Sequence, residues 1–141
     1  MLLNQLKQKI FFSFFFLEKM WSLGAIGLQN PRSLLRLVLW NNVMHLGMRG
    51  FKEQPDYHLS DFTVTEQYIK HKERQTKNRH GDEPTATKRV RKYKKKIWKT
   101  DGEERDPHRA FIEYVGHRPK GDNVPGNFYP SPVDSPIANF W

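Results

Sequence analysis

The sequence predicts a mostly α-helical chain with long irregular segments and little hydrophobic core of its own. Apolar runs concentrate in residues 1–50, the segment 70–109 is almost entirely polar and charged, and prolines crowd residues 116–141. Only 37% of the residues are hydrophobic, below the roughly 45–50% of ordinary globular domains. Such a chain is expected to order itself largely against other molecules, because its own buried surface offsets too little conformational entropy.

The N-terminal region, residues 1–50, is expected to form a pair of apolar helices that are embedded in a membrane or lie on its surface. Residues 10–28 have the length of a membrane span, which needs about 20 mostly apolar residues, but Glu18 and Lys19 fall near the middle. Each charge at that depth costs roughly 2.5–3.5 kcal/mol. A spanning and an interfacial placement therefore both stay open for the first helix.

A second apolar helix is predicted over residues 31–46. Asn30 suits the cap position, Pro31 suits the first helical position, and Gly47 is a typical C-terminal stop. A helix of this length extends about 24 Å, less than the roughly 30 Å of a hydrocarbon core. We expect it to lie in a membrane surface or between neighbouring subunits.

Two features of the N-terminal region are typical of mitochondrial transit peptides. No acidic residue occurs between Met20 and Lys52, and three arginines are spread through that stretch. A secretory signal peptide is the alternative, with Lys7 and Lys9 preceding the apolar run 10–17. No small-residue cleavage site follows promptly, so the mitochondrial interpretation is favoured.

The central region, residues 51–115, is predicted to contain charged helices. Thr63 and Glu66 are spaced as a capping box, in which each side chain satisfies a backbone donor of the other residue. Glu66 also precedes Lys70 by four residues, the favourable order for an ion pair on a helix. These features predict a helix that starts at Thr63 and is solvated along most of its length.

The segment 85–100 combines a helical pattern with the strongest charge of the chain. Val90, Tyr93 and Ile97 recur at helical spacing, which favours a helix over a strand. The basic block 88–99 contains eight positive side chains and no acidic one: Lys88, Arg89, Arg91, Lys92, Lys94, Lys95, Lys96 and Lys99. Such a block predicts contact with RNA, with anionic lipid or with an acidic protein partner. A solvated basic helix is the other interpretation.

A short helix and an extended docking tail are predicted at the C-terminal end. Asp106 and Pro107 are suited to begin the helix, and Gly116 is suited to end it. Five prolines exclude a regular helix or a central strand from residues 116–141. Four aromatic residues are expected to dock this tail onto a partner: Phe128, Tyr129, Phe140 and Trp141. A flexible solvated tail is the alternative.

No catalytic, cofactor-binding or metal-binding residue is predicted. The chain has no cysteine, which excludes disulfides, thiolate metal sites and cysteine nucleophiles, and its six histidines lack tight ligand spacing. No glycine-rich phosphate loop, nucleophile elbow or dinucleotide motif occurs. We therefore expect no enzyme, no cofactor and no small-molecule substrate.

Together these features predict a non-catalytic accessory subunit of a large assembly. Other protein subunits and membrane lipids are the expected partners, and RNA is a further candidate. By analogy of layout, the first hypothesis is a structural or assembly subunit of a respiratory-chain complex in the mitochondrial inner membrane. The alternative is a mitochondrial ribosomal protein of the matrix that contacts rRNA through the basic block 88–99.

Overall fold

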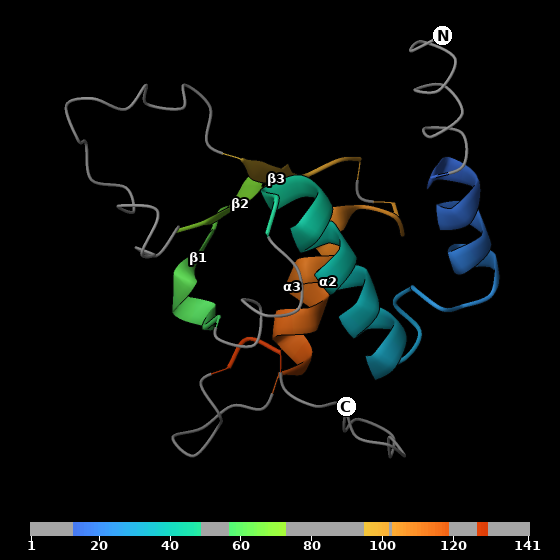
Figure 1. Cartoon of the computed structure of the whole chain (residues 1–141). Coiled ribbons are helices and arrows are strands. Elements are labelled where there is room, and N and C mark those ends of the chain that lie inside the picture. Colours follow the sequence, from blue (N-terminus) through green and yellow to red (C-terminus); the bar gives the residue numbers. More distant parts are fainter. Residues whose placement is uncertain (1–12, 49–56, 73–94, 102, 119–126, 130–141) are drawn as a thin grey trace, which may run out of the picture.

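Three α-helices and a three-stranded antiparallel sheet make up the part of the chain that the computed structural model describes, which is residues 13–48, 57–72, 95–101, 103–118 and 127–129 (Figure 1). Within the described residues, the first helix covers 13–22. The further elements are α2 (Pro31–Leu46), the 3₁₀ turn η2 (Leu59–Asp61), β1 (Phe62–Val64), β2 (Tyr68–His71), β3 (Lys96–Trp98) and α3 (Pro107–His117).

The caps of α2 confirm the bounds that the sequence predicts for it. The side chain of Asn30 accepts a hydrogen bond from the backbone N–H of Ser33 at 2.9 Å, and Pro31 occupies the first turn. Gly47 ends the helix in the left-handed region at φ 62°, and its N–H donates to the carbonyl of Asn42. Both ends are therefore fixed by residues next to the helix in sequence.

The predicted start of α3 is also confirmed. The carboxylate of Asp106 accepts a hydrogen bond from the N–H of His108 at 3.0 Å, and Pro107 is the first helical residue. The predicted end is early by one residue, because the helix continues through Gly116 to His117. Gly116 keeps a helical conformation, and no Cβ contact would restrict it.

The sheet has the order β1-β2-β3, with both pairs antiparallel. A tight turn joins β1 to β2, and Thr65 stabilises it. Its hydroxyl donates to the carbonyl of Tyr68 at 2.8 Å and accepts from the N–H of the same residue at 3.0 Å. The register then places Ile69 opposite Val64 on one side and opposite Ile97 on the other.

The prediction of a mostly α-helical chain is wrong in the central region. The expected helix from Thr63 is instead the hairpin of β1 and β2, and the end of the expected helix over 85–100 is β3. Residues 73–94 lie outside the described residues. Strand formation here is decided by pairing between segments far apart in sequence, which outweighs a local capping pattern.

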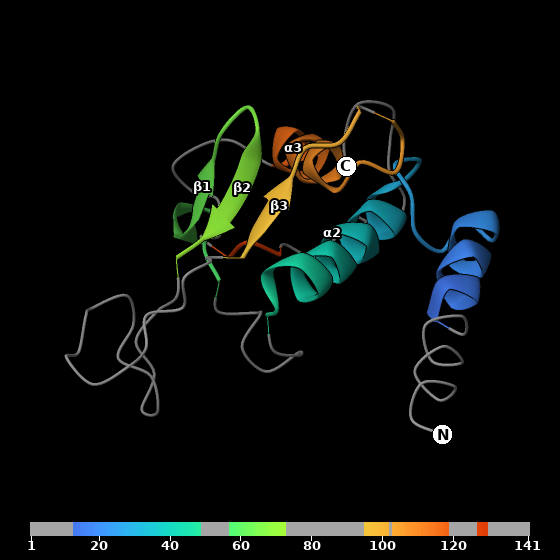
Figure 2. The same cartoon turned by 90° about the horizontal axis from the view of Figure 1, so that it is seen from above.

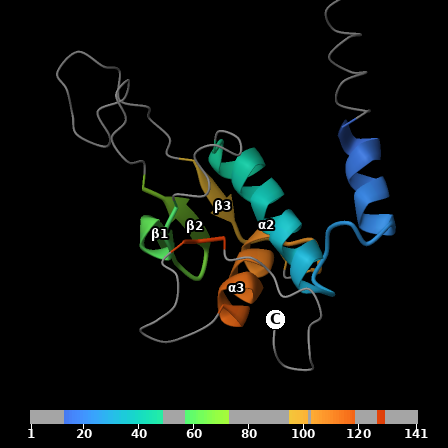
Figure 3. The ribbon, with the colours of Figure 1, turned by 60° about the horizontal axis from the view of Figure 1, so that its bottom comes forward.

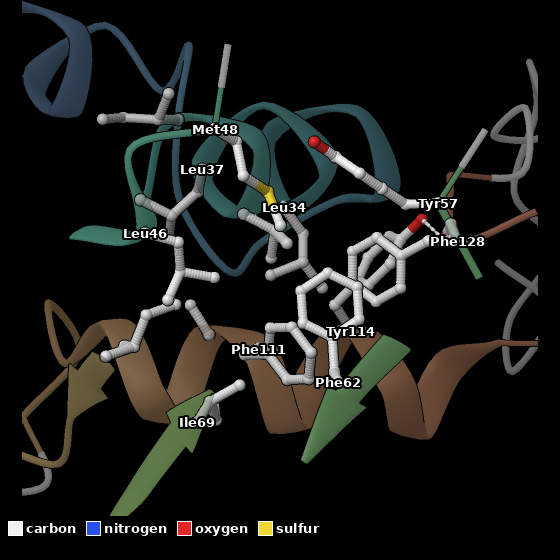
Figure 4. Packing of buried hydrophobic residues seen from close by; sticks show 14 residues of the cluster. Leu34, Leu37, Leu46, Met48, Tyr57, Phe62, Ile69, Phe111, Tyr114 and Phe128 are labelled. Atoms are coloured by element: carbon white, nitrogen blue, oxygen red, sulfur yellow. Dashed lines mark hydrogen bonds between the residues drawn. The ribbon is translucent and has the colours of Figure 1, made fainter. Parts of the chain in front are cut away.

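The prediction of little independent core is wrong as well. Both α2 and α3 contact β3 and lie on the same side of the sheet (Figures 2 and 3). Their buried side chains meet those of the sheet in one hydrophobic cluster, part of which Figure 4 shows. The cluster comprises Ile26, Leu34, Leu37, Val38, Leu46, Met48, Tyr57, Phe62, Ile69, Ile97, Ala110, Phe111, Tyr114 and Phe128.

Aromatic rings fill the centre of this cluster. Phe128 is fully buried, and its ring centroid lies 4.5 Å from that of Phe62 and 5.3 Å from that of Phe111. The hydroxyl of Tyr114 donates to the carbonyl of Phe128 at 2.8 Å (Figure 4). Residues 127–129, which belong to the predicted docking tail, thus close the core of the chain itself.

Candidate interaction surfaces

The described part of the first helix, residues 13–22, exposes three phenylalanines in its first turn, here called the Phe-rich end. Phe14, Phe15 and Phe16 are 62%, 59% and 49% exposed. The helix lies beyond α2, on the side away from the sheet (Figures 1 and 2). Consecutive helical residues point about 100° apart, so the three rings are spread around the helix and expose apolar surface on more than one side of it. Exposed apolar surface of this extent usually contacts a partner or a membrane.

The other end of the same helix is attached to the body of the molecule. Leu17, Met20 and Trp21 are partly buried against the core cluster. The guanidinium of Arg105 makes a two-pronged ion pair with Glu18, in which Nη2 donates to Oε2 at 3.1 Å, and it lies 5.2 Å from the ring centroid of Trp21. The helix is therefore anchored at one end and leaves its aromatic end free of the core.

The ion pair between Glu18 and Arg105 depends on pH and on salt. The hydrogen bond from Arg105, together with its positive charge, holds the pKa of the Glu18 carboxyl below its usual value. Because the pKa of Glu18 is lowered, the ion pair contributes its full stability above the ordinary pKa of a carboxyl group. This contribution is lost as the pH falls through the pKa that Glu18 has in the folded state. Both side chains are exposed, so salt will also weaken the pair.

The second candidate surface is the face of the sheet that points away from α2 and α3, here called the outer face. It carries Thr63, Tyr68, Lys70, Lys96 and Trp98, as the strand register requires. The opposite face carries Ile69 and Ile97, both fully buried. The outer face thus combines two aromatic rings and two lysines.

The two rings of the outer face lie against each other and against a lysine. The centroids of Tyr68 and Trp98 are 5.3 Å apart with the ring planes at 60°. The ammonium of Lys96 lies 3.7 Å from the centroid of Tyr68 and 4.9 Å from that of Trp98. These are cation–π distances, so Lys96 is held over both rings.

The described part of the predicted basic block does not form a single stripe. Lys96 lies on the outer face, whereas Lys95, one residue earlier, reaches toward Gly47 at the end of α2. Lys99 is exposed just after β3, and its N–H donates to the carbonyl of Gln67 at 2.8 Å. Because successive side chains of an extended strand point to opposite faces, the basic block is divided between the two sides of the sheet. Lys88, Arg89, Arg91, Lys92 and Lys94 lie outside the described residues.

The predicted docking aromatics also have different positions. Phe128 is fully buried in the core, and Tyr129 is half-buried with its hydroxyl accepting from Nδ2 of Asn42 at 2.7 Å. Phe140 and Trp141 lie outside the described residues. Tyr68 was not predicted as a surface residue, because it falls within the helix expected from Thr63. Strand alternation around Ile69 is the pattern that could have revealed it.

Neither a metal centre nor a membrane span stands out in the described ranges. Within them, no cluster of three or more His, Asp or Glu side chains is arranged to hold a metal ion. Among the same residues, no helix combines the length and the apolar character needed to cross a bilayer.

Comparisons of the chain with known protein families, with curated proteins and with solved structures each found no match.

Proposed function

We propose that the chain is a non-catalytic accessory subunit of a membrane-bound assembly, to which it attaches through the Phe-rich end of helix 13–22. The acid-free, arginine-bearing stretch after Met20 favours the mitochondrial inner membrane, and a respiratory-chain complex is the assembly that we propose.

The observation that carries this proposal is the exposure of Phe14, Phe15 and Phe16 at the end of a helix that is anchored elsewhere. Burying an exposed phenylalanine contributes roughly 1.5–3 kcal/mol. Leaving three of them in water is correspondingly unfavourable, so an apolar neighbour stabilises this arrangement. The core does not depend on these rings, and a partner can therefore cover them without refolding the body.

The proposal is tested by replacing the three phenylalanines with serine in the tagged full-length chain. Mitochondria are solubilised in a gentle detergent and separated by size. The wild-type chain is expected to migrate with a respiratory complex, and the triple variant to be released while keeping the wild-type melting curve. Ile112→Ser is the matched control, because Ile112 is an exposed apolar residue on α3, 43% exposed, and its replacement should release nothing.

Two outcomes contradict this function. The first is a wild-type chain that is absent from mitochondria or migrates as a free monomer. The second is a triple serine variant that stays with the complex as well as the wild type does, because the Phe-rich end would then make no essential contact.

A second candidate function, a mitochondrial ribosomal protein, is favoured by the outer face, where Lys96 lies beside Tyr68 and Trp98. Lysines and exposed aromatic rings are what proteins use to contact phosphates and unpaired bases of RNA. Co-sedimentation with ribosomal particles after detergent treatment, lost in high salt, would support this candidate. Sedimentation with membrane complexes alone would contradict it.

A further inference from the structure

We propose that the outer face of the sheet binds single-stranded nucleic acid, with an unpaired base stacked on Trp98 and an adjoining phosphate held by Lys96. The inference deepens the second candidate function by naming the ligand and the residues. It concerns a different face from the Phe-rich end and does not depend on attachment to a membrane assembly.

The register of the sheet is the first support, because it brings together residues that are distant in sequence. Tyr68 pairs with Trp98, and Lys70 pairs with Lys96, across β2 and β3. Directly opposed residues of an antiparallel pair point to the same face of a sheet. An aromatic pair therefore stands next to a lysine pair on one face of the sheet.

The accessibility of Trp98 is the second support. The residue is 57% exposed although it lies in a regular strand whose neighbour Ile97 is fully buried. The helices α2 and α3 lie on the other side of the sheet (Figure 2). Large exposed aromatic rings on a sheet are stacking surfaces for bases, and stacking tolerates any base because every base has a π-face.

The ammonium of Lys96 is the third support. It lies 3.7 Å from the ring centroid of Tyr68 and 4.9 Å from that of Trp98. A phosphate next to a base stacked on Trp98 would therefore lie close to a positive charge, and phosphate is the anion that recurs along a nucleic-acid strand.

The position of Lys96 suggests how the site changes when it is filled. Its ammonium now lies over Tyr68 and Trp98, where it is held by cation–π attraction. A phosphate is a stronger partner for an ammonium than a ring face. On binding, Lys96 moves to the phosphate and leaves the ring faces to the base.

The geometry favours a single strand over a duplex or a lipid surface. Bases in a duplex are already stacked on each other and are closed to a protein ring. The apolar side chains suited to a bilayer, those of the Phe-rich end, lie on the other side of α2 from the sheet (Figure 2). A membrane that contacts them does not face Trp98.

The test measures fluorescence anisotropy of labelled single-stranded oligonucleotides of about ten nucleotides, which is within the range that one stacking surface covers. The full-length chain is titrated into RNA and DNA versions of the same sequence, which decides between the two sources of the ligand. Trp98→Ala is expected to weaken binding about tenfold and Trp98→Phe much less, because stacking on a ring is worth roughly that factor. Ile112→Ala is the matched control on α3 and should bind as the wild type.

The salt dependence of binding distinguishes the contribution of Lys96 from that of the Trp98 ring. Replacing Lys96 with glutamine is expected to lower the slope of log affinity against log salt by about 0.7, the value for one phosphate on a single strand. Trp98→Ala should leave that slope unchanged. Circular dichroism confirms that each variant keeps the wild-type fold, which removes unfolding as the explanation.

Three results would overturn the inference. One is equal affinity of Trp98→Ala and wild type for the single strands. Another is binding of duplexes as tight as that of single strands. The third is binding of vesicles that contain anionic lipid together with no measurable binding of the oligonucleotides. None of these results bears on the release test of the Phe-rich end, so the two proposals fail independently.

Discussion

Individual buried hydroxyl groups make the stability of this fold sensitive to alkali. Burial raises the pKa of Tyr114 to about 12, from an ordinary value of about 10. Burial likewise raises the pKa of Tyr129. At a pH between the ordinary and the raised pKa, the tyrosine hydroxyl is deprotonated in the unfolded chain and still protonated in the folded chain. The free energy of unfolding therefore falls progressively as the pH rises through this range.

We therefore expect the free energy of unfolding to fall by on the order of 2 kcal/mol per buried tyrosine as the pH rises from about 10 to 12. Tyr114→Phe should be less stable at neutral pH by about 1 kcal/mol, because its hydrogen bond to Phe128 is lost. It should also show a shallower alkaline decline. Urea unfolding at a series of pH values measures both effects, and an unchanged decline in the variant would contradict the assignment.

A glycine at the end of α2 is expected to resist substitution because of its backbone conformation. Gly47 has φ 62°, and the atom nearest to a Cβ there is the ammonium of Lys95, at the end of a flexible, exposed side chain that can move aside. A left-handed conformation costs roughly 1–2 kcal/mol for alanine. Gly47→Ala should therefore destabilise the protein by about this amount, as measured by thermal unfolding.

Gly24→Ala is the matched comparison. Gly24 has φ 65° with no neighbouring atom near the Cβ position, so its substitution should cost the same backbone term. Because Lys95 can move aside, combining Gly47→Ala with Lys95→Ala should leave the cost at Gly47 unchanged. A Gly47→Ala variant as stable as the wild type would show that residue 47 does not adopt the left-handed conformation in solution.

Among the elements, helices with local start and stop residues could be predicted from the sequence. The ends of α2 are set by residues next to the helix in sequence, namely Asn30, Pro31 and Gly47. The start of α3 is set in the same way by Asp106 and Pro107. Cap and proline effects depend on neighbouring residues alone, so they can be recognised without knowing the fold.

The strands could not be predicted in the same way, because their partners are distant. The capping pattern at Thr63 is outweighed once Ile69 can be buried between β1 and β3. Thr65, inside the expected helix, instead closes the turn with its hydroxyl. The outer face could not be predicted because the strands were not predicted. The lysines and Trp98 were noticed as a basic block with an aromatic residue, but their alignment with Tyr68 follows only from the strand register.

At the start of α3, we expect Asp106 to stabilise more than an ordinary cap does. Its carboxylate accepts from the N–H groups of His108 and Thr100 at 3.0 and 3.2 Å, and the residue is 1% exposed. Asp106→Ala should cost roughly 2–3 kcal/mol, since two donors lose their acceptor in a buried place.

Asn30→Ala is the comparison, because Asn30 caps an equivalent position in an exposed setting and should cost only about 1 kcal/mol. Asp106→Asn keeps one acceptor oxygen and should fall between wild type and Asp106→Ala. Equal midpoints of urea unfolding for the two alanine variants would contradict the difference in burial.

For the whole molecule, the core is assembled from residues that look isolated in the sequence. Ile69, Ile97 and Phe128 each stand in polar or proline-rich surroundings, yet all three are fully buried. Local hydrophobic density underestimates a core of this kind, because each contributing segment supplies only one or two side chains. This is why the expectation of a chain without its own core is wrong.

Replacing Phe128 tests whether residues 127–129 hold the molecule together. Phe128 contacts the rings of Phe62, Phe111 and Tyr114, and Arg118 donates to its carbonyl. Phe128→Ala is expected to cost about 3–5 kcal/mol, as large-to-small changes of a buried phenylalanine do. Phe15→Ala makes the same chemical change at a side chain that is 59% exposed and should cost no more than about 0.5 kcal/mol. Urea unfolding of the two variants decides the matter, since similar midpoints would mean that the C-terminal segment is a strap on the surface and that the remaining residues form the core without it.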